Sequence, residues 1–144
     1  MVAMLLALAA CSTSQNTTQA RNKGPAEPPG AATTTSRNPL AKYLEIDGFR
    51  LAEAKPGTLK ITFVVVNHSE ADIGDLGLKI RLLTTASKPG EPPITEFDAK
   101  VPDLGPQEMK DVTVTAPTKL RIYELPDWQF LRAEFDVTSP AAQQ

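Results

Sequence analysis

The sequence predicts an all-β protein built around a single antiparallel β-sandwich of six to seven strands in residues 39–139. Three observations support this fold class. Apolar and polar side chains alternate in several short runs, turn residues separate these runs, and no run has the 3.6-residue period of a long helix. Short strands at such regular spacing are typical of a sandwich.

The clearest strand lies in residues 58–68, where every second side chain is apolar: Leu59, Ile61, Phe63 and Val65. Residues 76–82 and 131–137 repeat this period of two, and residues 95–101 and 112–114 show it more weakly. We therefore expect each strand to turn one apolar face toward a shared core.

The first strand, expected over residues 43–53, changes phase part of the way along. Its apolar positions are even before the change and odd after it: Leu44, Ile46, Phe49 and Leu51. Asp47-Gly48 lies at the change. This pattern predicts either a β-bulge or a strand that crosses between the two sheets.

Turns are predicted where Pro, Gly and Asp gather: Lys55-Pro56-Gly57, Ile73-Gly74-Asp75, residues 88–93, Gly105-Pro106 and Leu125-Pro126-Asp127. The longest stretch without strand pattern is residues 118–129. We expect it to hold a crossover or a short helical turn that carries Tyr123 and Trp128.

The N-terminus has the pattern of a secretory signal. Residues 1–10 are apolar and uncharged, but a membrane-spanning helix needs about 20 such residues. Leu8-Ala9-Ala10-Cys11 resembles the bacterial lipobox, which implies cleavage between Ala10 and Cys11 and lipid attachment to the Cys11 thiol. No Lys or Arg opens the segment, so we expect the true start to lie upstream. The alternative is an apolar segment that packs on the domain with a buried free thiol.

Residues 11–38 are predicted to form the lipidated cysteine and a disordered polar linker, because residues 12–38 contain no Val, Ile, Leu or aromatic side chain. A flexible chain of this length has an r.m.s. span of roughly 30 Å. Residues 140–144 are expected to be a flexible tail.

The domain itself resembles small immunoglobulin-like modules of bacterial surface proteins, the FxLYD-like and CARDB-like groups. The resemblance rests on a strand that ends in Val66-Asn67-His68-Ser69 and on the turn Asp103-Leu104-Gly105-Pro106-Gln107, and it covers residues 43–138. The tyrosine–aspartate pair of the FxLYD group is missing. The resemblance implies an immunoglobulin-like sandwich that serves adhesion or assembly without a fixed catalytic site.

Composition excludes several classes of function. The net charge of −2 argues against a nucleic-acid partner, which needs a basic face. A single cysteine allows no intramolecular disulfide, and a single histidine leaves little material for catalysis or for a transition metal. We predict no catalytic residues, no metal site and no cofactor.

The sequence offers three candidate sites, and each has a plainer interpretation. Trp128 and Tyr123, with Phe130, are candidates for an aromatic platform that binds a sugar or a partner, and the plainer interpretation is that Trp128 closes one end of the core. The loop residues Asn67, His68, Glu70, Asp72 and Asp75 offer oxygen ligands for Ca²⁺, but their spacing does not match a calcium loop and Asn67 is better placed to cap the turn. His68 has no serine at a spacing that marks a catalytic pair.

The leading hypothesis is a non-enzymatic interaction or accessory module of the cell envelope, held on the membrane through lipidated Cys11 and bound to a protein partner there. The first alternative is a carbohydrate-binding module for peptidoglycan or another glycan, and the second is a hydrolytic or metal-dependent enzyme. In a cell with two membranes, Ser12 after the cysteine implies the outer membrane, facing the periplasm.

Overall fold

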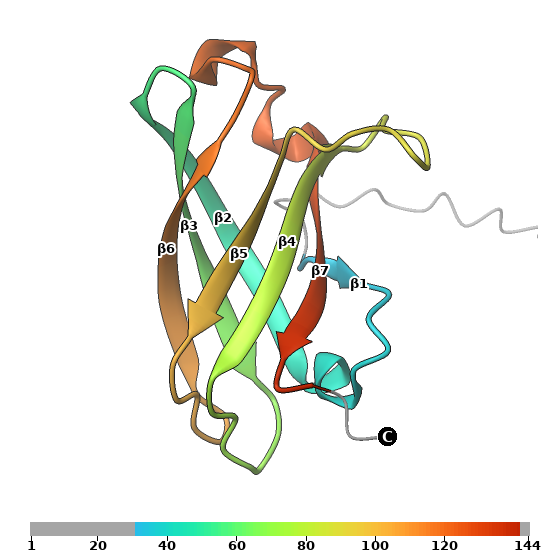
Figure 1. Cartoon of the computed structure of the whole chain (residues 1–144), viewed down its shortest axis with the longest axis vertical. Coiled ribbons are helices and arrows are strands. Elements are labelled where there is room, and N and C mark those ends of the chain that lie inside the picture. Colours follow the sequence, from blue (N-terminus) through green and yellow to red (C-terminus); the bar gives the residue numbers. More distant parts are fainter. Residues whose placement is uncertain (1–30, 142–144) are drawn as a thin grey trace, which may run out of the picture.

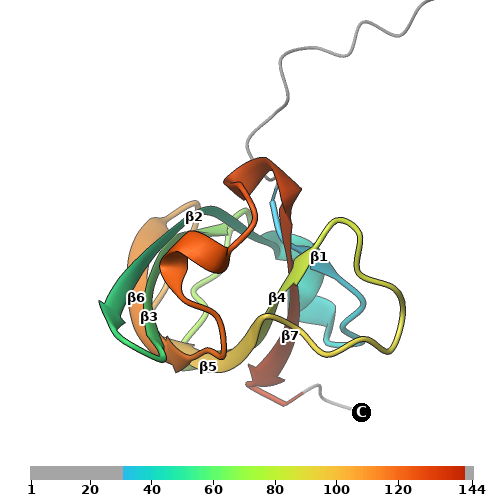
Figure 2. The same cartoon turned by 90° about the horizontal axis from the view of Figure 1, so that it is seen from above.

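The computed structural model describes residues 31–141, and these residues form a β-sandwich of two sheets that face each other (Figures 1 and 2). Within them, the four-stranded sheet has the order β1-β7-β4-β5 and the three-stranded sheet has the order β2-β3-β6. The helical turns are all 3-10 turns. The all-β sandwich predicted from the alternation of side chains is therefore confirmed.

The elements follow one another with short connections: β1 (Thr33–Thr34), η1 (Pro39–Tyr43), β2 (Leu44–Lys55), β3 (Thr58–Asn67), β4 (Leu76–Thr84), β5 (Thr95–Val101), β6 (Met109–Pro117), η2 (Ile122–Glu124), η3 (Trp128–Phe130) and β7 (Leu131–Ser139). All five predicted turns fall between strands or between η2 and η3. The crossover from β6 to β7 holds the two short helical turns η2 and η3, as its sequence suggested.

The core lies between the sheets and consists of the side chains predicted to face inward. β5 shows the pattern most clearly, because buried and exposed residues alternate along its whole length. In β3 the residues Leu59, Ile61, Phe63 and Val65 are all fully buried. The Phe63 ring lies 5.4 Å from the Phe49 ring and 6.2 Å from the Phe97 ring, which joins both sheets through aromatic contacts.

The phase change in β2 is a β-bulge. The strand advances from Asp47 to Arg50 while its partner β3 advances only from Val64 to Thr62, so β2 contains one extra residue. Gly48 lies at the bulge with φ of 67°, a conformation that glycine adopts without a steric penalty. The bulge turns the odd-numbered side chains after it toward the space between the sheets.

One expectation from the linker is wrong in its described part. A disordered segment was expected up to residue 38, but Thr33 and Thr34 form β1 and pair with Glu134 and Phe135 of β7. The pairing is parallel, whereas the strand pairs within residues 39–139 are all antiparallel, as expected. Backbone hydrogen bonds hold this strand, and the Thr34 hydroxyl donates to the carbonyl oxygen of Phe135 at 2.8 Å. Such a strand requires an open sheet edge to pair with, but it does not require apolar side chains.

The fold continues past the last strand for at least one residue. The Asn38 side chain, which is buried, donates a hydrogen bond to the carbonyl oxygen of Pro140 at 2.8 Å and caps η1 by accepting from the Leu40 amide at 3.1 Å. The start of the expected tail is therefore tied to the start of η1. Residues 142–144 lie outside the described part of the chain.

Candidate functional site

The two sides of the sandwich differ. On one side β5 and β6 contact each other and bring the two sheets together. On the other side lie β2 and β7, and there β1 and the residue before it link the two sheets. Ala32 donates its amide hydrogen to the carbonyl oxygen of Ile46 in β2 at 2.7 Å, and the next two residues pair with β7. This bridge closes only part of the space between β2 and β7.

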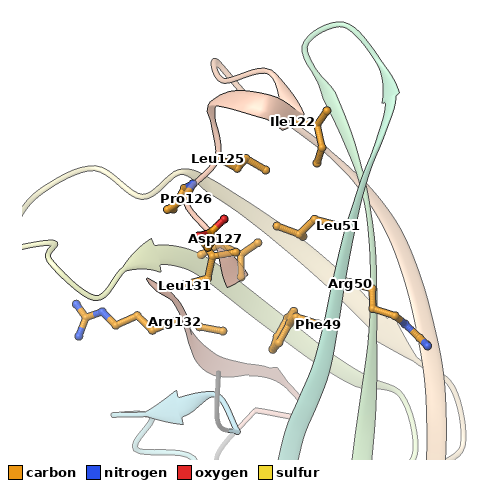
Figure 3. A pocket seen from close by; sticks show the side chains of 11 residues that line it. Phe49, Arg50, Leu51, Ile122, Leu125, Pro126, Asp127, Leu131 and Arg132 are labelled. Atoms are coloured by element: carbon orange, nitrogen blue, oxygen red, sulfur yellow. The ribbon is translucent and has the colours of Figure 1, made fainter. Parts of the chain in front are cut away.

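The remaining space is an apolar pocket of about 420 Å³, which we call the β2–β7 pocket (Figure 3). Its walls come from β2, from the end of β4, from the β6–β7 crossover and from the start of β7: Phe49, Arg50, Leu51, Leu82, Ile122, Leu125, Pro126, Asp127, Leu131, Arg132 and Ala133. Eight of these eleven side chains are apolar. Volume and lining are those of pockets that bind small apolar groups.

The β-bulge in β2 creates one wall of this pocket. Before the bulge Ile46 is fully buried in the core, and after it Phe49 and Leu51 are only partly buried, packing on the core and facing the pocket. Without the extra residue at Gly48, the strand would turn Phe49 and Leu51 toward solvent, because a shift of one residue reverses the face of every side chain. The bulge therefore positions the binding surface.

The roof of the pocket is the β6–β7 crossover, and a carboxylate at the far end of β2 holds it. The Arg121 guanidinium donates to the Glu53 carboxylate at 2.7 Å, and the Ile122 amide donates to its other oxygen at 3.3 Å. The Glu53 side chain is only 16% exposed, so this ion pair is more shielded than the other pairs on the surface. The contacts fix η2, and with it Ile122 and Leu125, above β2.

The charged residues of the lining are Arg50, Asp127 and Arg132, and all three are exposed. Arg50 and Arg132 line the mouth from opposite sides, and in Figure 3 both side chains point away from the pocket. Arg50 lies 3.7 Å from Asp111, and Arg132 lies 3.5 Å from Glu134. The Arg50–Asp111 pair is well exposed, so an incoming acidic group can compete for Arg50 at little cost. The Arg132–Glu134 pair is less exposed, with the Glu134 side chain at 29%.

The outer face of the four-stranded sheet is a ladder of opposite charges. Lys79 lies 3.5 Å from both Glu96 and Asp98, and the attraction of these carboxylates, Asp98 first, raises the pKa of the lysine. Arg81 lies 3.3 Å from Glu134. Because basic and acidic groups are paired across this face, it offers no strong field of one sign to a charged partner.

The predicted aromatic platform is only partly described. Tyr123 lies in η2 with 75% of its surface exposed, and the Arg121 guanidinium lies 5.5 Å from the centre of its ring, so one face of the ring has a neighbour. Phe130, in η3, is about half exposed. Trp128 begins η3, but its side chain lies outside what the structure describes. Whether these residues form one flat surface stays a prediction.

The acidic loop after β3 serves the fold. Among residues 31–141 no group of three or more His, Cys, Asp or Glu side chains is placed to hold a metal ion. Asn67 is fully buried, and its side chain bonds the backbone of its own loop and of the β5–β6 loop, which confirms its expected role as a cap. The His68 ring lies 2.6 Å from the Glu45 carboxylate at the exposed edge of β2.

The predicted lipidation site falls in the undescribed part of the chain. Ala10 and Cys11 precede residue 31, so cleavage and lipid attachment there stay predictions from the lipobox. In residues 31–141 no helix is long and apolar enough to cross a membrane.

The odd phase of Phe49 and Leu51 in the sequence indicated their change of face but did not predict the pocket, because the opposite wall comes from distant segments.

Fold and pocket together define a β-sandwich domain with a ligand-sized apolar pocket. Among solved structures, the chain is similar to a DUF1425 family member from Shewanella sp. pv-4, with 14% sequence identity and a TM-score of 0.33, over 69% of this chain and 81% of that chain. No family model matches the chain. No curated protein matches it either. A likeness at this level supports no statement about function.

Proposed function

We propose that this protein is a non-catalytic interaction module of the bacterial cell envelope, anchored by lipid on Cys11, whose binding site is the β2–β7 pocket. The observation that carries the proposal is the pocket itself, an apolar cavity of about 420 Å³ that opens between two strands. Ligand pockets of proteins fall at roughly 300–1,000 Å³ and are lined mainly by apolar side chains. The lipobox supports a location at the membrane surface, because a lipid-anchored domain meets its partners there.

A rigid frame supports a binding role for this pocket. Phe49 stacks on the buried ring of Phe63, and the carboxylate of Glu53 holds the roof. A pocket with a fixed shape loses little conformational entropy when a ligand enters, which favours affinity. The two arginines at the mouth favour a ligand that carries a carboxylate or phosphate beside its apolar group.

The proposal is tested by capture of partners from envelope extracts with the lipidated protein. Leu51→Arg places a charge on the wall of the pocket, and Met109→Arg makes the same change at a side chain of β6 that is 67% exposed. We expect a set of proteins that wild type and Met109→Arg capture and Leu51→Arg does not. Arg132→Glu, which changes the rim without touching the core, should weaken the same set.

Two results would contradict the pocket as the binding site. One is capture of the same proteins by all four forms. The other is loss of capture in Leu51→Arg together with loss of the folded circular-dichroism signal, while the folded Arg132→Glu variant captures as much as wild type.

Glycan binding is the second candidate, and the exposure of Tyr123 favours it. An exposed aromatic ring is a typical surface for stacking a sugar. A glycan array that includes peptidoglycan fragments should then give a signal that Tyr123→Ala removes and Leu51→Arg leaves intact. If the array gives no signal while partner capture depends on the pocket, glycan binding is rejected and the protein-interaction module is retained.

A further inference from the structure

β2 is an outer strand of the three-stranded sheet, so a neighbouring strand fills only one of its edges. On its other edge, the Ile46 carbonyl oxygen accepts a hydrogen bond from the Ala32 amide at 2.7 Å. Between Ile46 and Glu53, no backbone group of residues 31–141 bonds to this edge. We call this stretch, residues 47–52, the open β2 edge. It borders the β2–β7 pocket, because Phe49 and Leu51 belong to both.

The hydrogen-bond ladder fixes which backbone groups face the open β2 edge. Asn67 of β3 donates to Glu108, just before β6, so Thr62, five residues earlier in β3, faces β2 instead. Its partner Arg50 therefore turns its N–H and C=O groups toward β3. Leu51, the next residue, turns its own N–H and C=O groups the other way. A backbone donor and a backbone acceptor thus lie on the open β2 edge at the wall of the pocket.

The side chains along this edge alternate in chemistry. Phe49 and Leu51 face the pocket, and Arg50 points to the opposite side of β2 (Figure 3). The Arg50 side chain is 71% exposed. A strand that pairs with the open β2 edge alternates in the same way, so its inward side chains meet apolar groups and its outward side chain meets the guanidinium. The edge therefore matches a segment in which an acidic residue separates two apolar residues.

Two contacts limit the length of chain that fits. At one end, the backbone of Ala32 is bonded to Ile46. At the other end, the β6–β7 crossover lies against β2, where the Glu53 carboxylate accepts from Arg121 and Ile122. Residues 47–52 span about 20 Å as a strand. A window of this length suits one extended segment rather than the whole edge of another sheet.

We propose that the partner of the β2–β7 pocket binds as an extended strand, which hydrogen-bonds to the open β2 edge, places two apolar side chains in the pocket and pairs an acidic residue with Arg50. This inference rests on the proposed function, because it names the chemistry of the partner at the same site. In strand addition, backbone bonds supply affinity and pockets for alternate side chains supply specificity. The sandwich already holds one short strand in this manner, since β1 pairs with the outer edge of β7.

The test follows the Leu51 amide by NMR in the full chain, held in phospholipid nanodiscs. The probe is the peptide acetyl-Thr-Val-Asp-Leu-Thr-amide at millimolar concentration. We expect it to slow hydrogen exchange of the Leu51 amide several-fold, because that N–H gains an acceptor. The Ala52 amide is the matched control. It faces β3 in the ladder and should exchange at the same slow rate with and without the peptide.

Two altered peptides separate backbone pairing from simple filling of the pocket. The same peptide with N-methyl groups on its three central amides keeps its side chains but loses its donors, so it should leave the Leu51 amide unprotected. A peptide with Lys in place of Asp should protect this amide less in wild type. It should protect it more in Arg50→Glu than in wild type, because the charges of the cross-strand pair are then exchanged.

Equal protection by the N-methylated peptide, or no protection by any peptide, would overturn strand addition. A Leu51 amide that is protected without any peptide would also overturn it, because the edge is then filled by the chain itself or by a second copy.

The two proposals fail separately. If Leu51→Arg abolishes partner capture while no peptide protects the Leu51 amide, the pocket stays the binding site and strand addition is rejected. If the peptide protects this amide while Leu51→Arg captures as much as wild type, the edge binds strands but the envelope partners bind elsewhere. If both proposals hold, excess peptide should release the captured proteins.

Discussion

The side-chain nitrogen of Asn67 lies 2.9 Å from the carbonyl oxygen of Gly105, and this hydrogen bond joins two loops that are 38 residues apart in the sequence. The same nitrogen donates to the carbonyl oxygen of Ala71 at 2.8 Å, and the side-chain oxygen accepts from the amide of Ser69 at 2.9 Å. One fully buried amide thus ties the β3–β4 loop to the β5–β6 loop at the end of the sandwich opposite η2 (Figure 1). Such satisfied buried groups specify a single packing of the loops.

Replacement of this amide should destabilise the domain strongly. Asn67→Ala removes the side-chain donor to the Gly105 carbonyl oxygen and one of the two donors to the Ala71 carbonyl oxygen, and we expect a loss of about 2–4 kcal/mol in the free energy of unfolding. Urea denaturation measures it. Thr113→Ala is the matched control, since it removes one exposed hydroxyl contact with Thr62 and should cost about 0.5 kcal/mol or less. Equal losses in the two variants would contradict the role of Asn67.

The same position should make stability depend on pH in a defined direction. In Asn67→Asp, a buried carboxyl group faces the carbonyl oxygens of Ala71 and Gly105, which disfavours the charged form and raises the pKa of that carboxyl in the folded state above its unfolded value of about 3.9. The neutral form donates a hydrogen bond, so its stabilising contribution is present below about pH 4 and is lost as the pH rises through the raised pKa. The stability gap to wild type should therefore grow from acid to neutral pH in urea titrations. A constant gap would show that this carboxyl reaches solvent.

Gly77 in β4 should tolerate no side chain. A Cβ atom there would lie 2.8 Å from the Thr138 hydroxyl oxygen and 3.3 Å from the Ser139 backbone nitrogen, where β4 passes close to β7. We expect Gly77→Ala to lower the thermal midpoint by an amount that corresponds to about 1–3 kcal/mol. Gly74→Ala is the control, because its Cβ would meet nothing closer than 3.9 Å and its effect should stay within about 0.5 kcal/mol. Similar midpoints for the two variants would mean that β7 moves aside freely.

Loss of the Glu53 carboxylate should loosen the roof of the pocket without unfolding the sandwich. In Glu53→Ala the Arg121 side chain and the Ile122 amide lose their acceptor, and we expect a cost of about 1–2 kcal/mol. Hydrogen exchange should speed up in residues 121–125 and stay unchanged in β3. Glu91→Ala, in the exposed β4–β5 loop, is the control. Uniform acceleration over all strands would show a global effect instead of a local one.

The anchor is tested by cell fractionation. Cys11→Ser removes the thiol that the lipobox supplies, so the protein should move from the membrane fraction to the soluble fraction. Each buried CH₂ of an acyl chain contributes about 0.8 kcal/mol, so two or three chains make membrane attachment effectively permanent. Without these chains, release of the protein from the membrane should be complete. Ser12→Thr, one residue on, should stay on the membrane. A Cys11→Ser protein that also stays there would refute lipid anchoring through this cysteine.

Local patterning predicted the sandwich and the bulge in β2 but not the pocket. The odd phase of Phe49 and Leu51 after Gly48 indicated a bulge, and the bulge is what turns them inward. The opposite wall is formed by Leu125 and Leu131, which follow different patterns in distant segments. Their meeting with β2 depends on the order of the strands, and side-chain alternation within one strand carries no information about its neighbour.

The sequence by itself determined which faces of β3, β4, β5 and β7 are buried, where the chain turns and where β2 bulges, because these features depend on side chains within a few residues of one another. Only the tertiary structure decided that β1 pairs with β7 in parallel, and that β2, β7 and the crossover enclose a pocket. The pairing is made by backbone groups that every residue carries, and the pocket is the space that distant elements leave between them. Neither has a local signature in the chain.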